Sequence, residues 1–421
     1  MKICLCLPTN RQSVAAIQDL IAEARYAQDT FDVDVEVLIL DSASEPGHAE
    51  AVRQAPDALS IRHLDEPAQE RFLREVIQRA NVAKPDLILD LMLPDKLSYG
   101  ACTNRAFLIA AALGCDSVHR RDSDSGYQVH NGQKVYPVHH ELMSLGRKAA
   151  DARTTASDLG PEHAGKPVVL VGSSFIGELS VDIGEILDQD PDVYQEVVGL
   201  WAPGDWDDEQ RRDLVGESFR GAGTEPFHGD HSLLTIVDPM RVDMCNISFH
   251  QVHEDVPLPP MTDTIGSDYF LLHVVRNAGL PGVLHNRNIV NFHTPERKTG
   301  TGFTAYQLRY TKFLLSMLYL HFIYAKMAET PLLDKDNRVK ADVIAELARE
   351  SAWLGTDENV RRLDRLEAAY RRLGGKYAEF ADLLMPQRQR LLAEARQDIE
   401  DFAVLIDAWA PLVQASRTVG T

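Results

Sequence analysis

The sequence predicts an α/β protein with a mainly parallel sheet flanked by helices, followed by an all-helical C-terminal extension. The first 120 residues alternate between strand and helix patterns at the spacing of βαβ units. From about residue 303, strand patterns end and amphipathic helix patterns follow one another. We therefore predict an α/β domain over residues 1–302 and a helical extension over residues 303–421.

The first domain begins with strands and helices in regular succession. Apolar runs predict strands over residues 2–8, 33–42 and 116–124, and helical apolar stripes predict helices over residues 13–28, 70–83 and 101–115. Ligands of parallel sheets bind at the carboxyl ends of the strands, so we expect the polar residues that follow the strands to gather at one edge. They are Thr9, Asn10, Arg11, Asp41, Asp122 and Asp124.

The middle of the chain is less regular. Strands are predicted within residues 166–183, 233–239 and 245–252, and residues 282–300 predict a strand that runs into a polar loop. The Gly-, Asp- and Pro-rich segment 201–232 predicts an excursion loop. Residues 267–280 predict a helix with Ser267 as N-cap and Asp268 in its first turn. The extension predicts helices over residues 306–327, 340–353, 357–373, 376–385 and 389–415.

Composition limits the partners. The 421 residues include 43 Lys and Arg against 63 Asp and Glu, a net charge of -20, which disfavours nucleic acid as a partner. The longest apolar stretch, residues 313–327, falls short of the roughly 20 residues that span a bilayer, so we expect no membrane insertion. The N-terminal apolar run is too short for a secretion signal, and the five cysteines lack a disulfide or zinc spacing. We expect a soluble, cytoplasmic protein.

The strongest chemical signal is the segment "RRDSDSG", which places Asp122 and Asp124 at the end of a predicted strand. Two carboxylates at positions i and i+2 can hold one hard divalent cation, Mg²⁺ or Mn²⁺, which prefers oxygen ligands and leaves room for substrate phosphates. The position after a βαβ series and a buried helix strengthens this interpretation.

Four segments, taken together and in order, resemble the GT-A fold glycosyltransferases that use nucleotide-diphosphate sugars, in the manner of family 2. They are "LCLPTNR" (5–11), "VLILDSAS" (37–44), "YGACTNRAFLIAAALGCDSVHRRDSDSG" (99–126) and "SDYFLLHVVRNAG" (267–279). The resemblance covers parts of residues 1–300, and residues from 303 onward match no family that we can name.

The resemblance implies roles for individual residues. The nucleotide would be bound by Pro8, Thr9, Asn10, Arg11, Asp41, Lys96, Asn104, Arg105, Asp122, Arg297 and Lys298. Within this set Asp41 would accept hydrogen bonds from the base, and Arg105 with Lys96 would counter phosphate charge. Asp124, with Asp122, would ligate the metal. A nucleoside diphosphate leaves readily only when its developing charge is neutralised, which a metal and basic side chains achieve.

Two further positions follow from the resemblance. His293, which precedes Arg297 and Lys298, would be the third metal ligand. Asp268 would be the general base of an inverting enzyme, with Asp263 as the alternative, whereas a retaining enzyme needs no such base. From the residue types alone, Trp201, Trp206 and Asn246 are candidates for contacts with the sugar or acceptor.

The resulting expectation is a metal-dependent transfer of a sugar from a UDP- or GDP-sugar to a small soluble acceptor, a hydroxyl or a thiol, with secondary-metabolite or antibiotic biosynthesis as one setting. The extension would either form a homodimer or cover the acceptor site. Three alternatives stay open. The first is a sugar nucleotidyltransferase, although "PTNRQS" lacks the glycines of its phosphate loop. The second is a metal-dependent hydrolase, suggested by 15 histidines, and the third is a non-catalytic nucleotide-binding protein.

Overall fold

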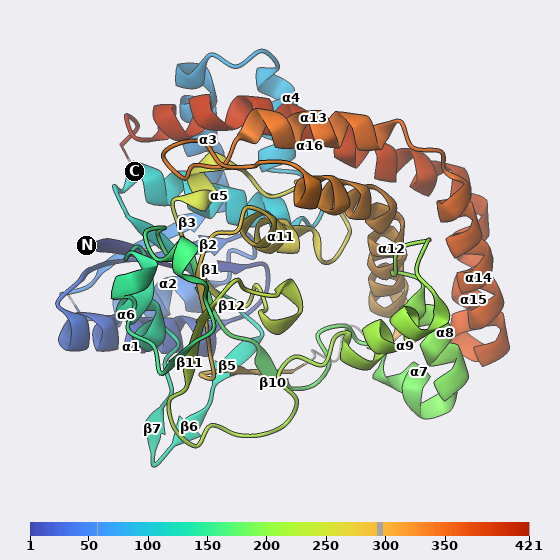
Figure 1. Cartoon of the computed structure of the whole chain (residues 1–421), viewed down its shortest axis with the longest axis horizontal. Helices are drawn as coiled ribbons and strands as arrows, with labels where there is room; N and C mark the ends of the chain where they lie inside the picture. The colour runs from blue at the N-terminus through green and yellow to red at the C-terminus, as the bar shows by residue number, and fades with distance from the viewer. Residues whose placement is uncertain (57, 293–297, 421) are drawn as a thin grey trace.

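The computed structural model describes residues 1–56, 58–292 and 298–420 and confirms the predicted fold class (Figure 1). Within these residues the central sheet has nine strands in the order β3-β2-β1-β4-β12-β9-β13-β11-β8, and five of its eight pairings are parallel. The strands are β1 (Lys2–Thr9), β2 (Asp34–Asp41), β3 (Ser60–Asp65), β4 (Ser117–Arg121), β8 (Ala156–Ser157), β9 (Leu170–Gly172), β11 (Ser232–Thr235), β12 (Asn246–His250) and β13 (Gly282–His285). Short strands outside this sheet are β5 (Ser125–Tyr127), β6 (Val129–His130), β7 (Gln133–Lys134), β10 (Phe175–Gly177) and β14 (Ile289–Asn291).

The carboxyl ends of the first strands meet at one edge, as the sequence predicts. Strands β1, β2, β3 and β4 are parallel, and the register aligns Thr9 of β1 with Asp41 of β2. Strand β3 is an addition to the prediction. Its segment "SIRHLD" lacks an apolar run because it lies at the sheet edge, where its side chains stay half-exposed.

Helices cover both faces of the sheet. In the α/β region they are α1 (Val14–Phe31), α2 (Pro46–Arg53), α3 (Glu66–Ala80), α4 (Pro85–Met92), α5 (Tyr99–Ala112), α6 (Val138–Ser144), α7 (Gly184–Gln189), α8 (Pro191–Gly199), α9 (Asp208–Glu217), α10 (Val252–Asp255) and α11 (Phe270–Asn277). Helix α5 is buried on nearly every side, as its apolar sequence predicts. The segment predicted as an excursion loop contains α9, because Asp207 and Gln210 form a capping box that starts a helix there.

The predicted helix at residues 267–280 begins differently from the expectation. Gly266, at φ 75°, precedes a 3₁₀ turn over Ser267–Tyr269, and α11 starts only at Phe270. The Ser267 hydroxyl is buried and caps no helix. The N-cap prediction for Ser267 is therefore wrong, while Asp268 does lie at the start of this helical segment.

The C-terminal helices pack onto the α/β region instead of forming a separate body (Figure 1). They are α12 (Gly300–Glu329), α13 (Ala341–Ala352), α14 (Asp357–Leu373), α15 (Gly375–Leu384) and α16 (Arg388–Ser416). One continuous apolar core joins both regions, and α16 lies against α3 and α5. The fully buried Trp409 of α16 donates its indole N–H to the His253 carbonyl at 3.1 Å. The change to an all-helical chain thus falls at Gly300, where α12 begins, and lies within a shared core.

Two further expectations concern the environment of the chain. Among the described residues, we find no helix with both the length and the apolar character that crossing a membrane requires. All five cysteines are free thiols.

Candidate active site

A cavity of about 470 Å³ opens at the carboxyl ends of β1, β2 and β4. Its lining includes six residues that the sequence places at strand ends, namely Pro8, Thr9, Asn10, Arg11, Asp122 and Asp124. Lys96, Arg105, Trp201 and Asp268, also predicted, line it as well. Helix α12 forms part of the opposite wall, so the C-terminal region contributes directly to the cavity.

The loop after β1 is held by a small hydroxyl network. The Thr9 hydroxyl accepts from the Ser13 hydroxyl at 3.0 Å and from the Arg11 backbone N–H at 3.3 Å, and it donates to the Arg11 carbonyl at 2.9 Å. The Arg11 guanidinium then reaches Asp124 at 2.7 Å. These contacts join the loop after β1 to the turn after β4, the two segments that the resemblance places around a nucleotide.

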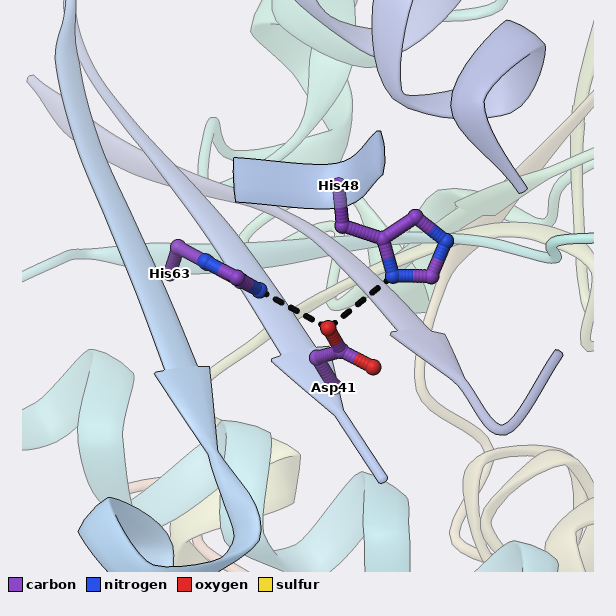
Figure 2. A group of neighbouring side chains, drawn as sticks. All are labelled: Asp41, His48 and His63. Carbon is purple, nitrogen blue, oxygen red and sulfur yellow. Dashed lines mark hydrogen bonds and ion pairs between the residues drawn. The ribbon is translucent and has the colours of Figure 1, made fainter. Parts of the chain in front are cut away.

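The side chain of Asp41 lies behind this loop, in a cluster with two histidines. Figure 2 shows the rings of His48 and His63 directed at the Asp41 carboxylate from two sides. Both rings lie 2.9 Å from Asp41 Oδ2, while Oδ1 accepts the backbone N–H groups of Ala43 and Ser44, each at 2.9 Å. Burial raises the pKa of Asp41, but the hydrogen bonds from His63, His48 and the backbone outweigh it, so the net pKa is lowered.

This arrangement corrects the prediction for Asp41. The carboxylate is fully buried, it does not line the cavity, and both oxygens already accept two hydrogen bonds each. It therefore has no acceptor left for a nucleobase. Its contacts instead fix His48, whose Nε2 accepts the Ser13 backbone N–H at 3.0 Å, so Asp41 supports the loop that carries Thr9.

The same three residues bring potential metal-ligating atoms within 4.8 Å of one another. The hydrogen bonds do not suit a metal, however. Because His48 Nε2 accepts a backbone N–H, the ring proton must reside on Nδ1, which points at Asp41. A metal at Nδ1 would require a proton on Nε2, facing the Ser13 N–H. We interpret the cluster as a hydrogen-bonded support.

A second group of carboxylates surrounds Arg120 at the end of β4. The buried guanidinium contacts Asp268 at 2.9 Å through Nη1 and Asp122 at 3.0 Å through Nη2. Asp243 also lines the cavity and accepts the Tyr269 hydroxyl. Arg120, Asp243 and Tyr269 were not predicted. The sequence signal for Arg120 was a pair of arginines at the end of a predicted strand, and a charged pair by itself does not indicate a function.

The electrostatics of this group fit a divalent cation. Burial raises the pKa of Asp122 to about 6; Arg120 counteracts this, and the negative charge of Asp124 adds to the rise. Burial likewise raises the pKa of Asp268, against the effect of Arg120. Four carboxylates, those of Asp122, Asp124, Asp243 and Asp268, meet two arginines here, Arg11 and Arg120, and carboxylate oxygens are the hard ligands that Mg²⁺ and Mn²⁺ prefer.

Two predicted cations lie at the same end of the cavity. Arg105 is buried and held by Gln69 Oε1 at 2.8 Å and the Met92 carbonyl at 2.6 Å. Lys96 lies nearer the surface, 3.8 Å from the carboxylate of Asp263, which does not itself line the cavity. Arg105 therefore holds its positive charge in a fixed position, whereas the Lys96 side chain is free to change its position.

Several predicted residues have other positions. Asn104 is fully buried and pairs with both backbone groups of Leu258 at 2.8 Å, a structural role. Asn246 is fully buried and donates to the Ser174 and Arg287 carbonyls, so it cannot reach a sugar. Trp206 and the exposed Lys298 do not line the cavity. His293 and Arg297 lie outside the described residues.

The chain matches, over residues 1–421, a family model described as a family of unknown function, DUF6271. The chain belongs to this family. No curated protein matches it.

Solved structures similar to the chain include a mannosyltransferase of Pyrobaculum calidifontis in complex with GDP-Man and Mn²⁺, at 13% identity and TM-score 0.35, covering 97% of this chain and 85% of that one. Another is glucosyl-3-phosphoglycerate synthase of Mycobacterium tuberculosis with phosphoglyceric acid, at 16% identity and TM-score 0.38, covering 75% and 79%. A third is described as a mycobacterial protein, at 14% identity and TM-score 0.37, covering 77% and 75%. Two of these are glycosyltransferases, the class that the sequence segments resemble. Since all three TM-scores lie below 0.5, we take the site's chemistry from this chain's own residues.

Proposed function

We propose that this protein is a glycosyltransferase that moves a sugar from a nucleotide-diphosphate sugar, UDP- or GDP-linked, to a small-molecule acceptor. One observation carries the proposal: a single cavity at the carboxyl ends of parallel strands combines the Asp-x-Asp carboxylates with four cations. The cations are Arg11, Lys96, Arg105 and Arg120. Such a mixture of charges suits a diphosphate and its counterion, and the carboxyl ends of parallel strands are where ligands of α/β sheets bind.

The nucleotide would lie along the loop after β1. Asn10 and Arg11 line the cavity there, and the hydroxyl network around Thr9 keeps their backbone in place without a ligand. Asp122 and Asp124 would hold a divalent cation, which when bound screens the charge of the diphosphate. Arg105 adds a buried positive charge that does not have to reorganise during the reaction.

Asp268 is suited to act as the general base of an inverting transfer. Its carboxylate would take the proton from the acceptor O–H or S–H as that atom forms its bond to the anomeric carbon. The bond between the anomeric carbon and the phosphate oxygen breaks, and the nucleoside diphosphate leaves with the electron pair. Burial raises the pKa of Asp268, which makes it a better proton acceptor than an exposed aspartate, and Arg120 keeps it oriented at 2.9 Å.

Thermal unfolding with a panel of UDP, GDP, ADP and dTDP, each with and without Mn²⁺, tests the proposal. A ligand present at about 100 times its Kd stabilises the folded state by about 2.7 kcal/mol. Asp124→Ala should abolish the Mn²⁺-dependent part of the stabilisation. Asp29→Ala, at an exposed position on α1, is the matched control and should keep it. The proposal is wrong if no nucleotide stabilises the protein, or if Asp124→Ala binds with unchanged dependence on Mn²⁺.

A further inference from the structure

The end of the cavity beyond Asp268 has a different chemistry from the nucleotide end. Five rings line it, one after another: Trp201, Phe219, Phe313, His321 and Tyr324, which we call the aromatic compartment. Ring centroids lie 6.3 Å apart for Trp201 and Phe219 and 6.0 Å apart for Trp201 and Phe313. Those of Trp201 and His321 lie 6.1 Å apart, and those of His321 and Tyr324 lie 6.4 Å apart. The rings thus form one continuous surface.

This surface carries no formal charge. The Trp201 indole N–H is already used by the Ser218 hydroxyl at 3.0 Å. Burial, with a smaller contribution from the positive charge of Arg362, lowers the pKa of His321 to about 3, so this ring is neutral at physiological pH. His273, stacked on Tyr324 at 3.6 Å, is kept neutral in the same way. Among the described lining residues, the lysine and arginine side chains all belong to the nucleotide end of the cavity.

Phe219 occupies a strained backbone conformation. Its φ of 64° lies in the left-handed region, which bulky residues rarely adopt and which costs about 1–3 kcal/mol. The conformation is held by the Ser180 N–H, which donates to the Phe219 carbonyl at 2.9 Å. Glycine would fit this backbone without strain, yet the sequence places a phenyl ring there, directed into the cavity. Strain of this kind concentrates at binding sites.

We propose that the acceptor is a compound with a flat, uncharged aromatic ring that stacks in the aromatic compartment and presents its O–H or S–H to Asp268. This inference rests on the proposed function. It assigns an acceptor role to helix α12, which supplies three of the five rings, Phe313, His321 and Tyr324. A sugar or a phosphorylated acid would leave its polar groups without partners against these rings, and desolvation would disfavour it.

Binding of three probes to the full chain, in the presence of saturating UDP or GDP and Mn²⁺, tests the inference. The probes are 2-naphthol as the aromatic hydroxyl compound, 3-phosphoglycerate as the phosphorylated acid and choline as a cation that could also favour aromatic rings. We expect 2-naphthol to bind at least tenfold more tightly than either of the others. Phe219→Gly should weaken its binding at least tenfold while the fold is retained, and Trp353→Ala, which removes an aromatic side chain that is 88% exposed, should leave it unchanged.

The outcomes separate the two proposals. Preference for 3-phosphoglycerate or choline, or an unchanged 2-naphthol affinity in Phe219→Gly, overturns the aromatic acceptor while a nucleotide response preserves the transferase. If 2-naphthol binds as expected and no nucleotide does, the transferase proposal fails and the compartment remains a site for aromatic ligands.

Discussion

Replacing Asp41 by Asn tests whether the Asp41 cluster supports the loop after β1. The two side chains have nearly the same shape, so packing should be preserved. The amide NH₂ would face His48 Nδ1, whose proton is fixed there by the Ser13 backbone N–H on the other side of the ring. If the His48 proton stays on Nδ1, it faces the new amide NH₂ group. If the proton moves to Nε2, it faces the Ser13 backbone N–H. Either way, two buried donors face each other. His63, which is partly exposed, can change its tautomer and adapt.

The expected loss can be estimated from the hydrogen bonds. A bond to a charged group contributes about 1.5–3 kcal/mol, and a buried donor without a partner costs about 1–3 kcal/mol. Asp41→Asn should therefore lower the free energy of unfolding by about 2–4 kcal/mol. His63→Ala, which leaves Asp41 bonded to His48 and to the backbone, should lower it by about 1 kcal/mol. The assay is urea-induced unfolding at pH 7 with a metal chelator present.

Two results would refute this reasoning. Equal losses in Asp41→Asn and His63→Ala would mean that the tautomer of His48 does not matter. If Zn²⁺ stabilises the wild-type protein and both variants abolish that stabilisation, the cluster binds metal instead. Nucleotide affinity, measured in the same samples, should fall in Asp41→Asn because the cluster holds the loop that carries Thr9.

Other predictions concern the packing around the site. Lys312, 2% exposed on α12, lies 3.6 Å from Asp398 and contacts a second carboxylate, so Lys312→Met should cost about 3 kcal/mol in unfolding experiments. Burial raises the pKa of Asp398 to about 6, although Lys312 opposes the rise. Near pH 5 Asp398 is protonated and no longer needs a positive partner, so the stability lost in Lys312→Met should be smaller at pH 5 than at pH 8. The reverse trend would contradict the role of this carboxylate. Gly100→Ala would place a Cβ atom 1.9 Å from the Pro259 carbonyl oxygen, so it should destabilise the protein by more than 2 kcal/mol, whereas a neutral result would mean that α5 can shift.

The strand-end residues show how far sequence reasoning reaches. Local patterns fix where each strand stops, and parallel strands must end at a common edge, so Arg11, Asp122 and Asp124 could be placed together from the sequence. The same reasoning failed for Asp41. Its position at the carboxyl end of β2 was predicted correctly, but the sequence does not show that His48 and His63 occupy its hydrogen bonds.

The acceptor end of the cavity could not be predicted from the sequence. Trp201 was a candidate, but Phe219 and Phe313 come from segments more than 90 residues apart, in a loop and in a helix of the extension. Periodicity identifies which face of a helix is apolar and does not identify what that face meets. The sequence predicts Phe313 on α12 to be an ordinary core residue, and the structure shows that it lines a cavity.

The sequence by itself determined the alternation of strands and helices in the first 120 residues, the change to helices near residue 300 and the edge at which polar residues gather, because these depend on local periodicity and on the parallel direction of neighbouring strands. The tertiary structure alone decided which carboxylates line the cavity and which lie behind it, since Asp122 and Asp41 lie at the ends of parallel strands of one sheet but only Asp122 lines the cavity. It also decided that the C-terminal helices form a wall of the cavity, because contact between distant segments depends on how the whole chain packs.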